Sequence, residues 1–168
     1  IMVHQYPDNE EELKLRYPDI SEAELKVFRL FKTISDDWYV WHSFIWMDKK
    51  RNILNESDVV VFHKYQGLLV LEVKGGGISI NKGAFFSLGK GPSKKLKNRL
   101  IKNPFRQANI AMYAIINAYV EYASQKSNHD ELLFNDGSNL KFLGRHSFGV
   151  IFPDTEFKKN ANSVKQLN

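Results

Sequence analysis

Three charged residues, Asp58, Glu72 and Lys74, interrupt an otherwise apolar stretch of the sequence. Burying an unpaired carboxylate is costly, so carboxylates in such a setting are usually paired or bound to a metal ion. One interpretation is an ion pair at the end of a strand, in which Lys74 neutralises a carboxylate. The other is a divalent-cation site, because hard carboxylate oxygens bind Mg²⁺, with the lysine beside the water or phosphate on which the metal acts. The residues alone leave both alternatives open.

Two short apolar runs, residues 59–62 and 68–73, predict the strands of a β-hairpin that carries these charges. Gly67 closes the connection between them. In the left-handed conformation at the end of a three-residue loop, it would pair Lys64 with Leu68.

The register of this hairpin decides whether the charges share one face of the sheet. Glu72 and Lys74 are two residues apart, so a strand points both to one side. With the pairing above, Asp58 lies opposite Lys74 and on the same face as Glu72, whereas a shift by one residue would turn Asp58 away. The sequence therefore permits two carboxylates and an ammonium on a single patch of sheet.

The order Asp58, hairpin, Glu72-Val73-Lys74 is similar to the core of the PD-(D/E)XK nuclease superfamily. More closely, ESDVVVFHKYQGLLVLEVKGG at residues 56–76, followed by NPFRQA at residues 103–108, resembles the nuclease-related domain family, NERD. The resemblance covers most of the chain. It implies an α/β, restriction-endonuclease-like fold with an αβββαβ core and a mixed central sheet flanked by helices.

The resemblance also implies roles for individual residues. Asp58 and Glu72 would hold Mg²⁺ or Mn²⁺, with the carbonyl of Val73 as a further ligand. Lys74 would orient the attacking water or help to deprotonate it. Gln107, in the NPFRQA motif, would support this catalytic site.

A helix expected from Asp19 or Ser21 to Ile34 carries a further candidate, Glu24. Ser21 and Glu24 match the S-x-x-E pattern of a capping box, which gives Glu24 an ordinary role at the helix start. The resemblance instead matches Glu24 to a helix-borne glutamate beside the metal, as a member of the catalytic site. Both interpretations stand on the sequence alone.

The net charge is +5, and its distribution points to a polyanionic partner. No acidic residue lies between Glu72 and Glu121, in an interval rich in lysine and arginine. A basic segment beside candidate carboxylates favours DNA, because neutralising phosphates releases counterions, although a solvated basic loop is the ordinary alternative. The residues expected to contact nucleic acid are Lys90, Lys94, Lys95, Lys97, Arg99, Lys102 and Arg106.

The chain divides into three expected parts. Residues 1–18 are an acidic N-terminal extension with a short helix, residues 19–156 form the nuclease-related domain, and residues 157–168 are a polar tail or a linker to a further module. The remaining predicted elements are an aromatic strand (38–46), a second hairpin (78–88), a basic loop (89–103), a helix (104–124), a polar loop (125–140) and a final strand (144–152). That strand should pair in parallel with an earlier one, because it follows a crossover helix.

Composition argues against several other classes of protein. There is no Cys, so disulfides and thiolate metal sites are excluded, and the scattered histidines lack the spacing of a zinc site. The glycines at 75–77 match neither phosphate-binding motif, which disfavours a nucleotide-binding regulatory domain. No apolar run approaches a membrane span and no signal peptide is recognisable, which fits a cytoplasmic protein.

The sequence thus favours a Mg²⁺-dependent phosphodiesterase that hydrolyses DNA, in DNA processing or repair. Its alternative is a catalytically inactive nucleic-acid-binding module. The resemblance also allows a helicase module in cis, because some members of the family carry one after this domain. The complete set of Asp, Glu and Lys argues against the inactive module, since a surface that only binds gains nothing from carboxylates facing phosphate.

Overall fold

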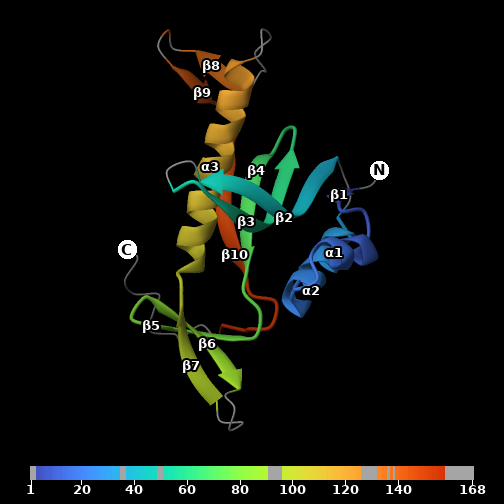
Figure 1. Ribbon diagram of the computed structural model, residues 1–168, viewed down its shortest axis with the longest axis vertical. Helices are drawn as coiled ribbons and strands as arrows, with labels where there is room; N and C mark the ends of the chain where they lie inside the picture. The colour runs from blue at the N-terminus through green and yellow to red at the C-terminus, as the bar shows by residue number, and fades with distance from the viewer. Residues whose placement is uncertain are drawn as a thin grey trace.

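A five-stranded mixed sheet forms the centre of the computed structural model (Figure 1). The structure describes residues 3–34, 37–48, 51–90, 96–125, 132–135, 137 and 139–157. The sheet has the order β1 (His4–Tyr6), β2 (Trp38–Asp48), β3 (Ile53–His63), β4 (Gly67–Val73) and β10 (His146–Ile151). Strands β2, β3 and β4 pair antiparallel, while β1 pairs in parallel with β2 and β10 with β4. The expected mixed α/β sheet, with a parallel final strand, is confirmed.

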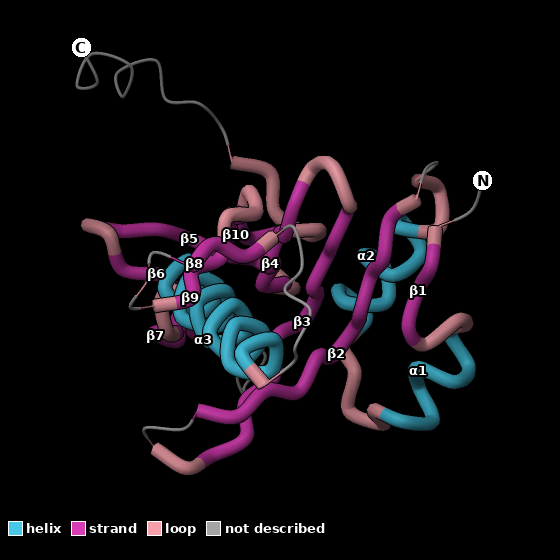
Figure 2. Tube along the Cα trace, turned by 90° about the horizontal axis from the view of Figure 1, so that it is seen from above, coloured by secondary structure: helices cyan, strands magenta, loops and turns pink. Residues whose placement is uncertain are grey.

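Helices cover both faces of this sheet, as the view in Figure 2 shows. Helix α2 (Glu22–Phe31) packs its Val27 in the same cluster as Val59 of β3. Helix α3 (Pro104–Ser124) packs Met112 in a second cluster with Val60. Neighbouring strand residues point to opposite faces, so β3 is apolar on both sides because both sides are covered. Among the described residues, no helix is long and apolar enough to cross a membrane.

The N-terminal residues pack against the domain through two elements. Helix α1 (Glu10–Arg16) begins at Asn9, whose side chain accepts a hydrogen bond from the Glu12 N–H at 2.8 Å, and its Leu13 is fully buried beside Phe28 of α2. Strand β1 lies at the edge of the central sheet. The short helix matches the prediction, whereas β1 was not predicted, because three residues carry no readable periodicity.

A second, three-stranded sheet lies between β4 and α3 in the chain. Strands β5 (Gly77–Asn81) and β6 (Ala84–Lys90) form the predicted hairpin, with positive φ at Lys82 (47°) and Gly83 (79°) in its turn. The prediction of a loop over residues 89–103 is wrong at β7 (Leu96–Ile101), which pairs antiparallel with β6. The segment LKNRLI lacks an apolar pattern of its own, so its strand is set by pairing with the β6 backbone.

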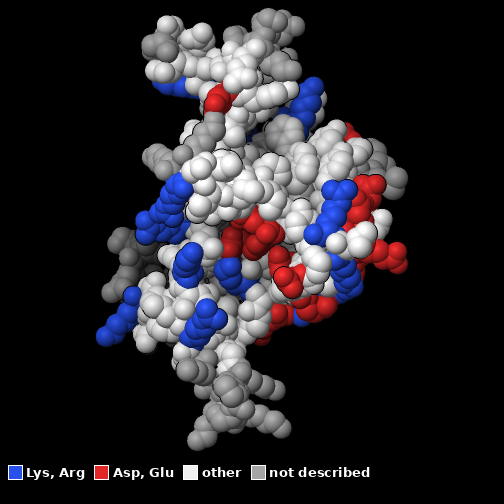
Figure 3. Space-filling view, viewed as in Figure 1, with Lys and Arg blue, Asp and Glu red and all other residues white. Residues whose placement is uncertain are grey.

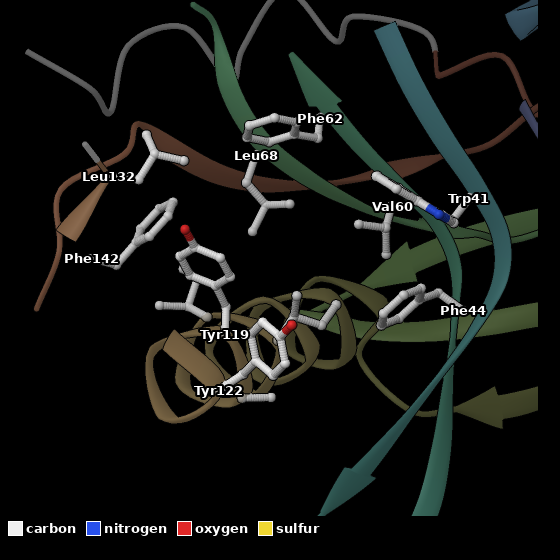
Figure 4. Close-up of a pocket in the computed structure, with 12 residues that line it drawn as sticks. Trp41, Phe44, Val60, Phe62, Leu68, Tyr119, Tyr122, Leu132 and Phe142 are labelled. Carbon is white, nitrogen blue, oxygen red and sulfur yellow. The ribbon is translucent and has the colours of Figure 1, made fainter. Parts of the chain in front are cut away.

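A short hairpin of β8 (Leu133–Asn135) and β9 (Leu140–Phe142) lies at the C-terminal end of α3 (Figure 1), where the sequence predicted a polar loop. An apolar pocket of about 490 Å³ lies between this hairpin, α3 and the sheet, and Figure 4 shows its aromatic lining of Trp41, Phe44, Tyr119 and Phe142. Its described lining carries no charged side chain. Phosphate chemistry therefore has no basis in this pocket.

Candidate active site

The β3–β4 hairpin brings Asp58 beside Glu72, although its register differs from the expected one. The paired residues run from His63↔Gly67 to Val59↔Leu71. Continued by one step, this register sets Asp58 opposite Glu72 and not opposite Lys74. The shift amounts to two residues, so it does not exchange the faces of the strands.

The register shift has a cause outside the hairpin. Gly67 has the expected positive φ, 99°, but it belongs to β4 and the loop ends before it. A Cβ on Gly67 would lie 2.0 Å from the carbonyl oxygen of Arg145, and the N–H of Leu68 donates to that oxygen at 2.9 Å. Close approach of the chain entering β10 thus requires glycine here, and it fixes where β4 begins.

Asp58 lies where the pairing of β3 with β4 ends. Its Oδ2 accepts a hydrogen bond from the Val73 backbone N–H at 2.6 Å. Burial and the charge of Glu72 raise the pKa of Asp58 to about 7, although the Val73 N–H and Lys74 act against the rise. This carboxyl is therefore costly to ionise without a cation close by.

Glu72 is buried and ion-paired. Its side chain is 7% exposed, and its Oε1 accepts a hydrogen bond from Lys74 Nζ at 2.5 Å. Burial raises the pKa of Glu72, and the contact with Lys74 opposes that rise. The ion pair considered in the sequence analysis is thus present, and Asp58 lies beside it as a second carboxylate.

Glu24 takes part in the predicted capping box and also acts on the site. The Ser21 N–H donates to Glu24 Oε2 at 2.8 Å, and the Glu24 N–H donates to Ser21 Oγ at 3.2 Å. The negative charge of Glu24 contributes to the raised pKa of both Asp58 and Glu72. The cap role is confirmed, and the helix start lies close enough for its charge to be felt by both carboxyls.

Two residues after β10 hold the glycine turn that follows Lys74. Asp154 forms an ion pair with Lys26 of α2 and accepts a hydrogen bond from the Gly76 N–H at 2.8 Å. Thr155 Oγ1 donates to the Gly76 carbonyl at 2.9 Å and accepts from the Ile78 N–H at 3.0 Å. The sequence analysis missed both residues. Their place directly after the final strand was the available signal.

A pocket of about 440 Å³ adjoins Glu72, and neither Asp58 nor Lys74 is among its lining residues. Gln107 lines it together with Glu72, as do Lys102 and Arg106. Helix α3 begins at Asn103, whose Oδ1 accepts a hydrogen bond from the Arg106 N–H at 3.2 Å, and this cap fixes the first turn that carries Gln107. Acidic side chains gather at the middle of the face in Figure 3, with basic side chains beside them.

The predicted basic residues fall into two groups. Lys102 and Arg106 lie in the pocket, and Arg99 is exposed on β7. Lys94 and Lys95 lie outside the described residues, and so do the side chains of Lys90 and Lys97. The opposite wall, which sequence reasoning missed, is lined by Trp46, Asp48, Arg51, Asn55 and Glu56. The only available signal was that Glu56 opens the segment on which the resemblance rests.

The donor set suits a small divalent cation. Within the described residues, no three His, Asp or Glu side chains are grouped as a metal site. Mg²⁺ needs fewer protein ligands, because it keeps several waters and binds one or two carboxylates together with substrate phosphates. Asp58, Glu72 and the Val73 carbonyl offer hard oxygens. The charge of Glu72 already raises the pKa of Asp58, a repulsion that a cation would relieve.

Comparison with known proteins agrees with the geometry. The family described as nuclease-related domain (NERD) matches residues 21–135, which include α2, the β3–β4 hairpin and α3. No curated protein and no solved structure matches the chain. The match spans more than half of the chain, and this protein belongs to the nuclease-related domain family.

Proposed function

We propose that this protein is a Mg²⁺- or Mn²⁺-dependent deoxyribonuclease that hydrolyses phosphodiester bonds in DNA processing or repair in the cytoplasm. The observation that carries the proposal is the grouping of three charges: Lys74 binds Glu72, and the charges of both act on the carboxyl of Asp58, while Glu72 also lines a pocket that holds Lys102 and Arg106. Two carboxylates and a lysine beside a pocket that holds Lys102 and Arg106 suit a reaction in which a phosphate must be bound and a water activated.

Asp58, Glu72 and the Val73 carbonyl would hold the cation. Bound there, it supplies Lewis-acid polarisation of the phosphate and a lowered pKa of its water. The Asp58 carboxylate is kept in place by the Val73 N–H. The Glu72 carboxylate is kept in place by its burial in β4.

Lys74 would serve the water and the phosphate. In the metal-free protein its Nζ binds Glu72 Oε1. When Glu72 is shared with a cation, this ammonium can turn towards the pocket, orient the attacking water and offset developing charge. Gln107 supports the same pocket from α3, and Glu24 adds negative charge from the start of α2.

The basic residues would hold the DNA backbone. Lys102 and Arg106 lie in the pocket, where their charge can bind the phosphates that flank the scissile bond. The residues proposed to extend this contact are Lys90, Lys94, Lys95, Lys97 and Arg99. Such contacts carry no sequence information, so we expect binding without sequence preference.

A DNA-binding module without catalytic activity, with a helicase module in cis, is the second candidate. The neutralisation of Glu72 by Lys74 favours it, because the pair is already satisfied without a metal.

Nicking of supercoiled plasmid separates these functions. The wild type should nick with Mg²⁺ or Mn²⁺ and not in EDTA, and Asp58→Asn and Lys74→Ala should not nick. Two variants serve as controls. Asp19→Asn removes a charge of the same sign as Asp58, and Lys14→Ala removes one of the same sign as Lys74, each from an exposed position outside the pocket, so both should nick normally. A wild type that shifts DNA in a gel but never nicks it favours the module without activity.

A further inference from the structure

The β2–β3 hairpin extends beyond the central sheet as a two-stranded arm. Its strands pair with each other as far as Asp48↔Ile53, while β4 pairs with β3 only over residues 59–63. We call residues 44–48 and 53–57 the arm. Ser43, with a φ of 53°, lies where the arm leaves the sheet. In Figure 1 the end of β2 crosses α3, and both elements line the same pockets.

Two pockets lie between the arm and α3. The first, about 440 Å³, adjoins Glu72, and the second, about 470 Å³, lies further along α3 beside Tyr113 and Asn117. Both are lined by Trp46, Arg51 and Ile110, among others, so the two pockets are neighbours. We call the two pockets together the arm groove. It begins at the candidate active site and runs towards the middle of α3.

The chemistry of the arm groove changes along its length. Beside Glu72 it carries the cationic side chains of Lys102 and Arg106 together with the acidic side chain of Glu56. Arg51, 77% exposed, lines both pockets and lies 3.8 Å from the carboxylate of Asp48, which also lines both, and Glu121 lines the second. Further along, Tyr113 is 53% exposed. The groove thus offers charged side chains of both signs at one end and aromatic surface at the other.

One ring of the groove is held in place. The indole N–H of Trp46 donates to Ser57 Oγ at 3.0 Å, and Ser57 is itself almost fully buried. This bond, together with the packing of Trp46 against the core cluster of Val60 and Met112, orients the indole on the wall that both pockets share. A fixed ring and an exposed tyrosine are the kind of surface on which nucleic-acid bases stack.

We propose that the arm groove binds an unpaired DNA strand, which makes single-stranded DNA, or the unpaired end of a duplex, the substrate class of this site. Lys102, Arg106 and Arg51 suit phosphates, and the aromatic rings of Trp46 and Tyr113 suit base faces. The faces of paired bases are already stacked within a duplex and cannot use such rings. Each pocket also has the size of a small-ligand site, about 300–1,000 Å³. The cleavage of that strand rests on the proposed function, whereas its binding does not.

Binding in EDTA tests the groove without any catalysis. Fluorescence anisotropy would compare a labelled oligothymidylate with a blunt hairpin duplex of the same nucleotide number. The wild type should bind the unpaired strand at least about ten-fold more tightly, about 1.4 kcal/mol. Equal affinity for the two, or tighter binding of the duplex, would overturn the proposal.

Variants on the groove supply the second arm of the test. Tyr113→Ala should weaken oligothymidylate binding about five- to 150-fold, the range for loss of one stacked base, and leave duplex binding unchanged. The control is Tyr65→Ala, which removes a 75% exposed tyrosine from the β3–β4 turn. An equal loss in the two variants would contradict stacking in the groove.

Arg51 tests the phosphate contact. Arg51→Ala should reduce the slope of log affinity against log salt for the unpaired strand by about 0.7, the single-strand value per phosphate contact. Arg16 is an exposed arginine of α1 that lines neither pocket of the groove, so Arg16→Ala should leave the slope unchanged. An unchanged slope in Arg51→Ala would contradict a phosphate contact at Arg51, and with it the binding of the strand along the arm groove.

The outcome for the groove is separable from the outcome for the nuclease. A preference for the unpaired strand that depends on Tyr113, without plasmid nicking, would support strand binding in the arm groove and contradict the proposed nuclease activity. Nicking by a wild type that shows no such preference would support the nuclease activity and contradict strand binding in the arm groove.

Discussion

Asp58 Oδ2 accepts a hydrogen bond from the backbone N–H of Val73 at 2.6 Å, immediately beyond the last residue pair of β3 and β4. A carboxylate therefore stands where a strand carbonyl would otherwise continue the ladder. The same peptide chain then presents the Val73 carbonyl and the Lys74 side chain. This bond couples the position of one proposed ligand to the backbone of another.

Asp58→Asn tests this arrangement without removing the hydrogen bond. Asn keeps an oxygen for the Val73 N–H but carries no charge beside Glu72, so at pH 8 in EDTA the variant should be as stable as the wild type or more stable. Asp58→Ala should be about 1 kcal/mol less stable than Asp58→Asn, because it also loses the hydrogen bond. Of the wild type and the two Asp58 variants, Mg²⁺ should raise the melting temperature of the wild type alone. A Mg²⁺ effect of equal size in Asp58→Asn would exclude Asp58 as a ligand.

Lys74→Ala should separate metal binding from catalysis. It leaves Glu72 buried without its cation, which should lower metal-free stability on the order of 3 kcal/mol. Mg²⁺ should restore part of that loss, and plasmid nicking should stay absent. Lys14→Ala breaks an exposed ion pair with Glu10 and should lower stability much less than Lys74→Ala does. Thermal melting with a Mg²⁺ titration measures the effects on stability and metal binding, and plasmid nicking measures the activity. A Lys74→Ala variant that nicks DNA would contradict the role of the lysine.

Glu24→Gln distinguishes the two roles of that side chain. Gln can replace Glu in a capping box, so the melting temperature should hardly change. Mg²⁺ affinity should fall, because a negative charge that acts on both Asp58 and Glu72 has been removed. Glu22→Gln is the control, since Glu22 forms an exposed pair with Arg29 on the same helix. Identical Mg²⁺ titrations for the two variants would leave Glu24 with the cap alone.

The elements that the sequence predicts are those with strong local signals. Helix α3 begins at a capping Asn103 and Pro104 and keeps an apolar stripe, and α2 has its capping box. Strands β7, β8 and β9 escape prediction because they are short or charged, and pairing with a neighbour decides their structure. The hairpin register escapes it because Arg145, far along the chain, fixes the start of β4.

The candidate site divides in the same way. Asp58, Glu72 and Lys74 can be found from the sequence, because charges inside apolar strands are conspicuous. Arg51 cannot, because it reaches the site region only through long-range packing of the arm. Asp154 reaches it from the segment after β10, and its place directly after the final strand is the only sign of it in the sequence. The basic residues are visible as a composition, but only the fold shows that Lys102 and Arg106 share a pocket with Glu72.

His42 should make stability depend on pH. Burial lowers the pKa of His42 from 6.5 to about 4, and its recorded neighbours Gln5, Phe28 and Phe31 do not titrate. Between these two pH values the unfolded chain binds a proton that the folded protein excludes. Stability from this group is therefore complete above pH 6.5 and falls as the pH drops towards 4, by about 3 kcal/mol in total.

The check is urea unfolding at a series of pH values. The double variant Gln5→Leu/His42→Phe removes the titrating ring and its buried partner together, and should lose this part of the pH dependence. His4→Gln, at an exposed position, should retain it. If the free energy of unfolding depends on pH in the same way in the wild type and the double variant, then the pKa of His42 is not lowered by folding.

Gly75 offers the sharpest test of how α2 is held against the site. A Cβ on Gly75 would lie 2.5 Å from the Cβ of Ala23, whereas Asp154 Oδ2 would be at an ordinary 3.4 Å. Gly75→Ala must therefore push α2 away from the turn after Lys74, at a cost of about 1–3 kcal/mol. The displacement moves Glu24 on the same helix turn, so the Mg²⁺-dependent rise in melting temperature should also shrink.

Ala23→Gly makes this explanation specific. Alone it should cost about 1 kcal/mol, as glycine does inside a helix. In combination with Gly75→Ala it removes the clashing methyl group, so the double variant should be more stable than the sum of the two single changes by about 0.5–3 kcal/mol. Gly89→Ala is the control, because an added Cβ there meets no atom within 4 Å. The wild type, the two single variants, the double variant and Gly89→Ala would be unfolded in urea with and without Mg²⁺. Additive single effects would show that the contact of Ala23 with Gly75 does not set the distance of α2 from the carboxylates, whereas recovery of both stability and the Mg²⁺ response would show that it does.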